Sequence, residues 1–296
     1  MSKRSSLNTR KIAFRAALLA GLFGGIAVLW PALAASPAGQ TAPAPNFGPN
    51  SDTAWIPARP AGDDFIPPES GPGPVMSEKA HPYIPNGQGK VSYRVADLSN
   101  PILQPWAAER MKKPNEEVLA GKVPFTADSR CWPGGVPGFD IYARVRPIYF
   151  LQTPKEITII EESDMQVRRI YLNVPHSANP APSWYGESVG HYEGDELVVD
   201  TIGLNDKSFV DSYRTPHTTK MHVVERFKML EGGKILQATI MVDDPGAFTT
   251  PWSATQRWKR REGDTITELI CAENHTDFFH NETEAGPIPQ AEKPDF

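Results

Sequence analysis

The chain of 296 residues lacks the sequence features of several large classes of protein. Its formal net charge is −5 and its Lys and Arg residues form no cluster, which argues against nucleic-acid binding, because phosphate contacts need a concentrated basic surface. It contains no Gly-rich nucleotide-binding motif, so we expect neither NAD, FAD nor ATP and predict no cofactor. Its histidines show neither H-x-H nor H-E-x-x-H spacing, and we predict no metal site.

The N-terminus, by contrast, has the order of a secretory signal peptide. Residues 1–15 are basic and contain no acid, residues 16–34 are apolar, and Ala32-Leu33-Ala34 offers an A-x-A cleavage site. We therefore predict a signal peptide over residues 1–35, a mature chain that begins near Ala35, and a periplasmic or secreted location. The alternative is an uncleaved anchor, because the apolar stretch is long enough to span a bilayer. That anchor would be the only membrane contact we expect.

Cysteine is scarce. The two cysteines, Cys131 and Cys271, have no C-x-x-C partners, which argues against a cysteine-based metal site. An even pair in an exported protein predicts one disulfide, here closing a long loop. The alternative is two buried free thiols.

Proline and periodicity divide the rest of the chain. Residues 36–89 are rich in Pro and have scattered apolar residues, which predicts an extended, largely disordered tether with a few aromatics docked on the folded part. Residues 90–140 are expected to form a helix and loop segment packed on the main domain. Its helical pattern lies in residues 100–122, which Pro105 and Pro114 divide into two short helices. We expect Trp106, Met111 and Leu119 to share one side of this region, and residues 281–296 to form a flexible tail.

Residues 141–280 contain about nine strand-like segments, the last at residues 265–273, which are rich in β-branched and aromatic residues. Short turns separate most of them, and short connections imply antiparallel neighbours. The pattern predicts a mainly β fold: an antiparallel up-and-down barrel of lipocalin-like (calycin-like) architecture with an interior cavity. A β-sandwich is the alternative.

One motif suggests a serine hydrolase. Residues 186–190 read G-x-S-x-G, the pattern of a nucleophile elbow. An elbow needs a strand before the serine and a helix after it, but here a loop precedes the motif and a hairpin turn follows it. We therefore predict that Ser188 is not a nucleophile. Alternation instead places Ser188, Gly190 and Tyr192 on one face of a strand, where the small side chains leave room for a neighbour.

Several strings resemble an uncharacterised family of exported bacterial β-rich proteins. They are ESVGHYEGDELVVDTIGLNDKSFVD, TPHTTKMHVVERF, DDPGAFTTPW and CAEN. The family pattern is S-x-G-x-[WY]-E-G-D-x-L-V-V-D-T-x-G-x-N-D, followed by P-H and V-x-E-R-[FY], and the resemblance covers residues 152–277. It implies an exported β-rich domain and transfers no catalytic residue.

Two glutamates are candidates for acid–base chemistry. Glu225 alternates with apolar residues in residues 220–229, and Glu268 lies between Ile266 and Ile270, so both are expected to face the interior. Burial raises the pKa of a carboxyl group, which suits a general acid or base. The alternative is a buried Glu–Arg or Glu–Tyr pair that closes the barrel. The candidate partners are Arg168, Arg169 and Arg257.

Histidines and aromatic residues complete the predicted site. We take His217, in a loop expected at the barrel end, and His191 as further catalytic candidates; the alternative for each is a solvated surface histidine. His176 lies in a similar loop, and His222 and Arg226 lie on the face opposite Glu225. The predicted ligand-binding residues are Trp184, Tyr185, Tyr192, Asn205, Arg226 and Trp252.

These observations predict an exported barrel that binds a small apolar or aromatic organic molecule in its cavity. An enzymatic reading adds cofactor-independent lyase, isomerase or hydrolase chemistry. The alternatives are a non-catalytic periplasmic carrier and an envelope interaction module that uses the Pro-rich segment as a spacer.

Overall fold

The computed structural model describes residues 43–58, 64–83, 94–122, 125, 131–137, 147–162 and 166–271. The predicted signal peptide (residues 1–35) and tail (residues 281–296) lie outside these residues. Within the described part of the chain, no helix is both long enough and apolar enough to cross a membrane.

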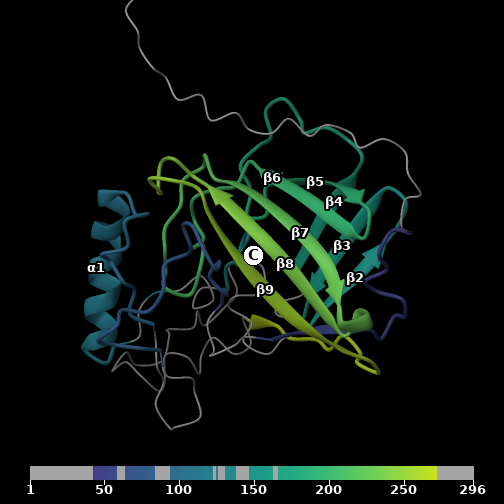
Figure 1. Ribbon diagram of the computed structural model, residues 1–296, viewed down its shortest axis with the longest axis horizontal. Coiled ribbons are helices and arrows are strands. Elements are labelled where there is room, and N and C mark those ends of the chain that lie inside the picture. The colour runs from purple at the N-terminus through teal and green to yellow at the C-terminus, as the bar shows by residue number, and fades with distance from the viewer. Residues whose placement is uncertain are drawn as a thin grey trace, which may run out of the picture. The chain divides into compact units, whose positions relative to one another are not determined.

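The fold is mainly β, as predicted: nine strands form one closed barrel in sequence order (Figure 1). A barrel of about this size has an interior just wide enough for its inward side chains to fill. The strands are β1 (Ala54–Pro57), β2 (Ile148–Gln152), β3 (Glu156–Glu161), β4 (Gln166–Leu172), β5 (Glu187–Glu193), β6 (Glu196–Ile202), β7 (His222–Leu230), β8 (Ile235–Asp243) and β9 (Trp252–Arg261).

The barrel departs from the predicted up-and-down topology at one seam. β4 and β5 are parallel, whereas every other neighbouring pair is antiparallel. The reason is one of parity, because strands that alternate in direction around a closed ring must be even in number. With nine strands, one neighbouring pair has to run the same way, and residues 173–186 make the long crossover that a parallel pair requires.

The membership of the barrel also differs from the prediction. β1 lies within residues 36–89, which were expected to be largely disordered, and it pairs with β9 from Ala54↔Arg261 to Pro57↔Trp258. That expectation is wrong for this stretch, because Phe47, Trp55 and Phe65 bury their rings in the core. The docking of a few aromatics, which was predicted for this segment, is what brings the chain into the sheet.

At the other end, the predicted strand over residues 265–273 is wrong. Residues 264–270 are not in a strand, and Glu268 is exposed. The segment lies outside the sheet and is bonded through a side chain to the residue that follows β3. The backbone N–H of Thr267 donates to Oε1 of Glu162 at 2.8 Å. β1 therefore occupies the position in the ring that the sequence pattern had assigned to the C-terminal segment.

Helix α1 (Pro105–Leu119) is continuous through Pro114, so the predicted break into two helices is also wrong. Pro105 lies at the start of the helix, where its missing N–H costs nothing. The buried side is formed by Ala107, Met111 and Asn115, while Trp106 and Leu119 are exposed. The side-chain amide of Asn115 donates to Ala96 O and accepts from Ala96 N, both at 2.9 Å, and so ties the helix to the segment before it.

Side chains occupy the interior positions of the barrel. Alternate residues of β7 and β8 are buried, as period two predicts. Aromatic rings pack in a chain across the interior: Phe47 with Phe150 at 5.2 Å, Phe150 with Phe227 at 6.2 Å, and Phe227 with Trp258 at 6.3 Å between ring centroids. These contacts take up space where the sequence suggested a ligand cavity.

The predicted disulfide between Cys131 and Cys271 is confirmed, with 5.6 Å between the two Cα atoms. It joins the loop that precedes β2 to the segment that follows β9. Both cysteines lie outside the strands, so the bond joins two segments that are not part of the sheet.

Candidate functional site

Glu225 is buried, as predicted, and it forms an ion pair with Arg168, which was the stated alternative to a catalytic role. Nη1 of Arg168 donates to Oε1 of Glu225 at 3.0 Å, and Nη2 donates to Oε2. Arg168 and Glu225 come from β4 and β7, so the pair spans the interior across β5 and β6. Both side chains are 4% exposed or less, so the ion pair is buried away from water.

Ser188 belongs to the same interior network. Its Oγ lies 2.8 Å from Thr201 Oγ1 and accepts from Nε and Nη2 of Arg168 at 3.3 Å. It is buried, and the strands around it lack the strand–turn–helix of a nucleophile elbow. The room left by Gly190 is taken by Ile170, whose Cγ2 would lie 2.9 Å from a Cβ at that glycine.

A different set of titratable side chains gathers on the outer face of β5, β6 and β7. We call it the outer-face relay: Glu187, His176, Asp200 and His222. Oδ1 of Asp200 lies 2.9 Å from Nε2 of His176 and 2.9 Å from Nε2 of His222, so one carboxylate oxygen meets two imidazoles. The other ring nitrogen of His176, Nδ1, lies 3.1 Å from Oε1 of Glu187.

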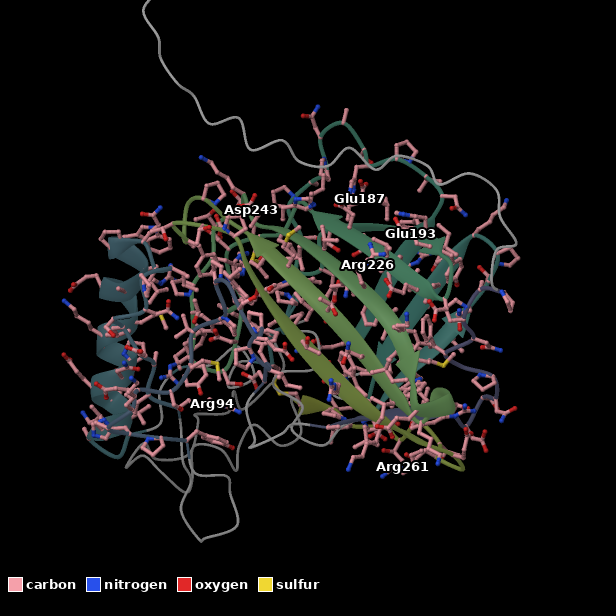
Figure 2. All side chains as sticks on the ribbon, viewed as in Figure 1. Arg94, Glu187, Glu193, Arg226, Asp243 and Arg261 are labelled. Atoms are coloured by element: carbon pink, nitrogen blue, oxygen red, sulfur yellow. A yellow bond between two sulfur atoms is a disulfide. The ribbon has the colours of Figure 1, made fainter. Side chains whose placement is uncertain are left out.

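The sheet register brings these residues together. Val189 of β5 pairs with Asp200, and Asp200 pairs with Val224 of β7, which places the outward Asp200 between Glu187 and His222. His176 comes from the crossover loop, residues 173–186, which folds back over this face. Figure 2 shows Glu187 at the same side of the barrel as Glu193 and Arg226.

Electrostatics favour the charged forms of His222, Asp200 and Glu187. The hydrogen bond that His222 donates to Asp200 raises the pKa of His222, against burial, which lowers it. Burial raises the pKa of Asp200, but the hydrogen bonds of His222 and His176 outweigh it, so the pKa lies below its ordinary value. Hydrogen bonds from the hydroxyl and N–H of Ser177 lower the pKa of Glu187.

His176 has a carboxylate oxygen at each of its two ring nitrogens. A neutral imidazole has one N–H, so it can donate to only one of them, whereas the imidazolium donates to both. Its side chain is 21% exposed and that of His222 is 29% exposed. The relay is therefore sheltered, yet within reach of solvent and of a dissolved molecule.

The predicted catalytic residues do not converge. Glu225 lies inside the barrel, whereas His191 is on the outer face, with Nε2 3.0 Å from Oε1 of Glu193. His217 is buried, so it is not the solvated surface histidine that was the alternative to a catalytic role. Its Nε2 lies 3.0 Å from Ser208 Oγ, and burial lowers the pKa of His217. Glu268 is exposed, because its segment is not a strand.

The predicted ligand-binding residues are likewise spread over separate places. Tyr192 accepts a hydrogen bond from Gln152 Nε2 at 3.0 Å, and Trp252 packs in the core against Phe65 and Phe248. Tyr185 bonds to Gln166, and Asn205 Oδ1 accepts from the backbone N–H of Lys207 at 3.0 Å. Arg226 lies outside, paired with Glu193 and Glu196. Trp184 lies in the crossover loop, next to the relay.

Sequence reasoning identified some members of the relay without joining them. His176 was noted as a loop histidine at a barrel end, and His222 was placed on the outer face. The missed signal is that polar residues occupy the outward positions of three consecutive strands: Glu187, Asp200 and His222. Outward polar residues are common on antiparallel sheets, so only the loop that returns His176 to this face distinguishes the site.

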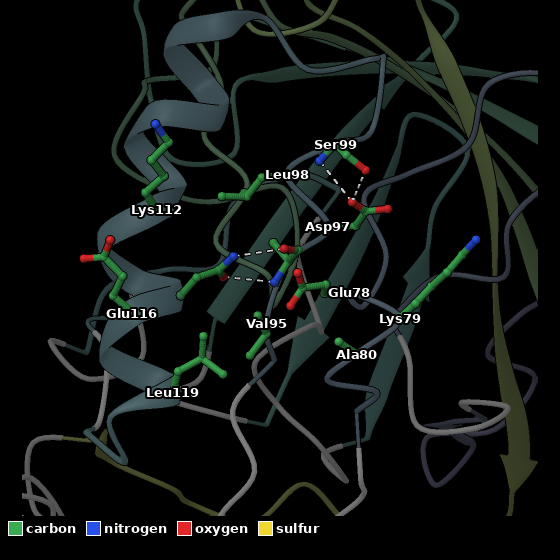
Figure 3. A pocket seen from close by; sticks show the side chains of 12 residues that line it. Glu78, Lys79, Ala80, Val95, Asp97, Leu98, Ser99, Lys112, Glu116 and Leu119 are labelled. Carbon is green, nitrogen blue, oxygen red and sulfur yellow. Dashed lines mark hydrogen bonds between the residues drawn. The ribbon is translucent and has the colours of Figure 1, made fainter.

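Two further polar regions serve the structure. Burial raises the pKa of Asp211 to about 7, and this carboxyl group accepts hydrogen bonds from Thr215 and Tyr213 within a closed loop. A hollow of about 560 Å³ lies beside α1 (Figure 3). There Asp97 accepts from Ser99, and Asn115 is bonded to Ala96, so these polar groups hold the loop and the helix.

Among the residues that the structure describes, no three His, Cys, Asp or Glu side chains are arranged to hold a metal ion. Comparison with known proteins assigns no family to the chain: no family model matches it, and no curated protein matches it.

Proposed function

We propose that this protein is an exported, cofactor-independent acid–base enzyme, and that its reactive groups are the outer-face relay rather than the barrel interior. One observation carries the proposal: a single oxygen of Asp200 binds the imidazoles of His176 and His222. A carboxylate that holds an imidazole fixes its orientation and stabilises its charged form, which is the arrangement of a histidine acid–base pair.

His222 is the proton-transferring group in this proposal. The neutral ring takes a proton from the substrate, and Asp200 stabilises the imidazolium that results. The imidazolium then returns the proton to another atom of the same molecule, so protons balance over the cycle. Isomerase or lyase chemistry follows from such a shuttle. The hydrogen bond to Asp200 raises the pKa of His222 above its ordinary value, which makes the neutral ring a stronger base.

The packing of the interior supports placing the reaction outside. The Arg168–Glu225 pair and the chain of aromatic rings occupy inward positions, which a carrier of an interior ligand would leave open. The barrel then acts as a rigid scaffold that holds the outer strands in register. Sites on rigid strands keep catalytic groups in place more precisely than sites on loops alone.

A substrate-independent probe tests the proposal. The protein is incubated with 5-nitrobenzisoxazole, whose C3 proton is removed by a base as the N–O bond breaks, and the nitrophenolate product is followed by absorbance. We expect kcat/KM to fall about 100-fold in His222→Gln. In the unmodified protein, the rate should rise with pH through a pKa above the ordinary histidine value of 6.5.

His191→Gln is the matched control, because His191 is also a partly exposed histidine on this face with one carboxylate partner. It should retain the full rate. Equal rates for His222→Gln and the unmodified protein would overturn the enzymatic proposal and favour a binding function for this face.

A further inference from the structure

We infer that an exposed cluster of aromatic rings beside the relay binds a small aromatic carboxylate, whose ring packs on Trp132 and Trp184 and whose negative charge meets Lys207. The inference rests on the proposed function, since it names the class of substrate for the same site. The aromatic cluster is defined by four residues: Phe125, Trp132, Trp184 and Phe209.

The rings of the cluster form one continuous surface. Trp132 and Trp184 have centroids 5.5 Å apart and planes inclined by 51°. Phe125 meets Trp132 edge to face at 5.7 Å and Phe209 at 6.2 Å. Rings in contact are usually buried, yet Phe125 is 42% exposed and Trp132 is 39% exposed. Contiguous exposed aromatic surface of this kind marks a binding site.

A cation lies over one ring of the cluster. Nζ of Lys207 lies 5.8 Å from the centroid of the Trp184 ring, and Lys207 is exposed. Its backbone is fixed by the hydrogen bond to Asn205 Oδ1. An ammonium group beside an aromatic surface complements a molecule that has a planar apolar body and an anionic end. Asp206, also exposed, precedes Lys207, so an aromatic amine is the competing ligand that the experiment has to separate.

The cluster and the relay lie at the same end of the barrel. Ser183 bridges to Leu204, just beyond the Glu187↔Ile202 pair at the end of β5 and β6. Trp184 is three residues before Glu187, so their Cα atoms are at most about 11 Å apart. Trp184 also shares the crossover loop with His176. A molecule seated on Trp184 therefore lies at the end of the barrel where Glu187 begins the relay.

The surface is held in place before any ligand arrives. Trp132 follows Cys131, which the disulfide fixes. Gly135 packs so closely on the loop under Trp184 that a Cβ there would lie 2.5 Å from Ser208 Oγ and 3.1 Å from the Trp184 carbonyl oxygen. Ser208 in turn lies within hydrogen-bonding distance of the buried His217. Rigid aromatic groups bind with a smaller loss of side-chain entropy than mobile ones.

The test titrates the whole protein with three probes of one shape: 2-naphthoate, the neutral naphthalene-2-carboxamide and the cationic 2-naphthylmethylamine. Binding is measured by isothermal titration calorimetry, with tryptophan fluorescence as a second readout. We expect 2-naphthoate to bind tightest and its affinity to fall with added salt. Trp132→Ala should weaken it about tenfold, and Lys207→Gln should remove the preference for the anion.

Trp106→Ala is the matched control, because Trp106 is 41% exposed but lies on α1, where its Nε1 donates to Gly246 O at 2.6 Å. It should leave the affinity unchanged. The inference is overturned if 2-naphthoate does not bind or if the amine binds equally well. It is also overturned if the protein instead binds phosphatidylcholine–phosphatidylglycerol vesicles through the aromatic cluster.

Failure of the inference and failure of the proposed function are separable. Turnover of 5-nitrobenzisoxazole that depends on His222, without binding of 2-naphthoate, rejects only the aromatic carboxylate. The opposite result is binding of 2-naphthoate that depends on Trp132, with no effect of His222→Gln on turnover. That result rejects the enzymatic proposal. The inference is then rejected as well, because it names a substrate, and the protein is a carrier of aromatic carboxylates.

Discussion

Arg168 and Glu225 form an ion pair inside the barrel, where both side chains are buried away from water. Ser188 and Thr201 complete the shell, since Nη2 of Arg168 lies 3.0 Å from Thr201 Oγ1. The pair joins β4 to β7 and so bridges the parallel seam from within. Two buried charges that satisfy each other contribute little net free energy, but either one alone is costly.

Glu225→Gln should therefore lower the free energy of unfolding by about 3–5 kcal/mol, because it leaves the guanidinium of Arg168 buried without a counter-charge. The double variant Arg168→Met/Glu225→Leu should recover most of this loss, since it removes both charges. Urea denaturation at neutral pH measures both. Glu156→Gln, which breaks the exposed pair with Arg169, is the control and should change stability little. A Glu225→Gln protein as stable as the parent would contradict the structural role.

The pH dependence of stability should report on Asp200 and His222. The pKa of His222 is raised, so its contribution is present below the ordinary value of 6.5 and is lost as pH rises through the raised value. The pKa of Asp200 is lowered, so its contribution is present above the ordinary value of 3.8 and is lost as pH falls through the lowered value. The difference in unfolding free energy between the parent and Asp200→Asn should peak between these two ordinary values.

Chemical denaturation across this pH range supplies the measurement. His191→Gln should keep the peak, because Asp200 and His222 remain paired. A difference between parent and Asp200→Asn that does not change with pH would show that the relay carries no charge in the folded protein.

Gly135→Ala should destabilise the loop beneath the aromatic cluster. The φ angle of Gly135 is +77°, which alone costs a non-glycine residue about 1–3 kcal/mol, and the new Cβ would also press on Ser208 and the Trp184 carbonyl. Gly194→Ala separates the two effects, since Gly194 has a φ angle of +60° with no atom within 4 Å. Thermal unfolding should show the larger loss for Gly135→Ala, and equal losses would mean that the contact with Ser208 is not tight.

Removing the disulfide by Cys131→Ser with Cys271→Ser should lower the free energy of unfolding by about 4 kcal/mol, because the bond closes a loop of 140 residues in the unfolded chain. Denaturation with and without reductant measures this, and thiol alkylation followed by mass spectrometry counts free cysteines. Two alkylated thiols in non-reduced protein would contradict the bond.

The sequence predicted the sheet best where alternation is regular. In β7 the buried positions alternate regularly with the outward ones. Glu225 was assigned to the buried face because it shares its period of two with the apolar residues of the strand. β1 was missed for the opposite reason. Its four residues, Ala54–Pro57, are too few to show a period, and the prolines around them suggested disorder.

The site was harder to predict than the fold. His217 follows a proline in a loop, a position typical of exposed residues, and its burial depends on the packing of residues 131–137, which lie far away in the sequence. The relay depends on a crossover loop whose path no local pattern specifies. Counting strands would have supplied one missing fact, since an odd ring requires a parallel pair and hence a long crossover.

The pairing of β1 with β9 also affects the timing of folding. The ring closes between strands about two hundred positions apart, and the chain is made from its N-terminus, so β1 can pair with β2 only at Trp55↔Ile148 until the end of the domain has left the ribosome. Contacts so distant in sequence form late, because chain entropy opposes them until the intervening strands have ordered. During that interval β1 lacks its longer pairing with β9, from Ala54↔Arg261 to Pro57↔Trp258, and its apolar side chains are incompletely covered. A chaperone that holds this segment, rather than one that acts on the central hairpins, should therefore have the larger effect on the yield of folded protein.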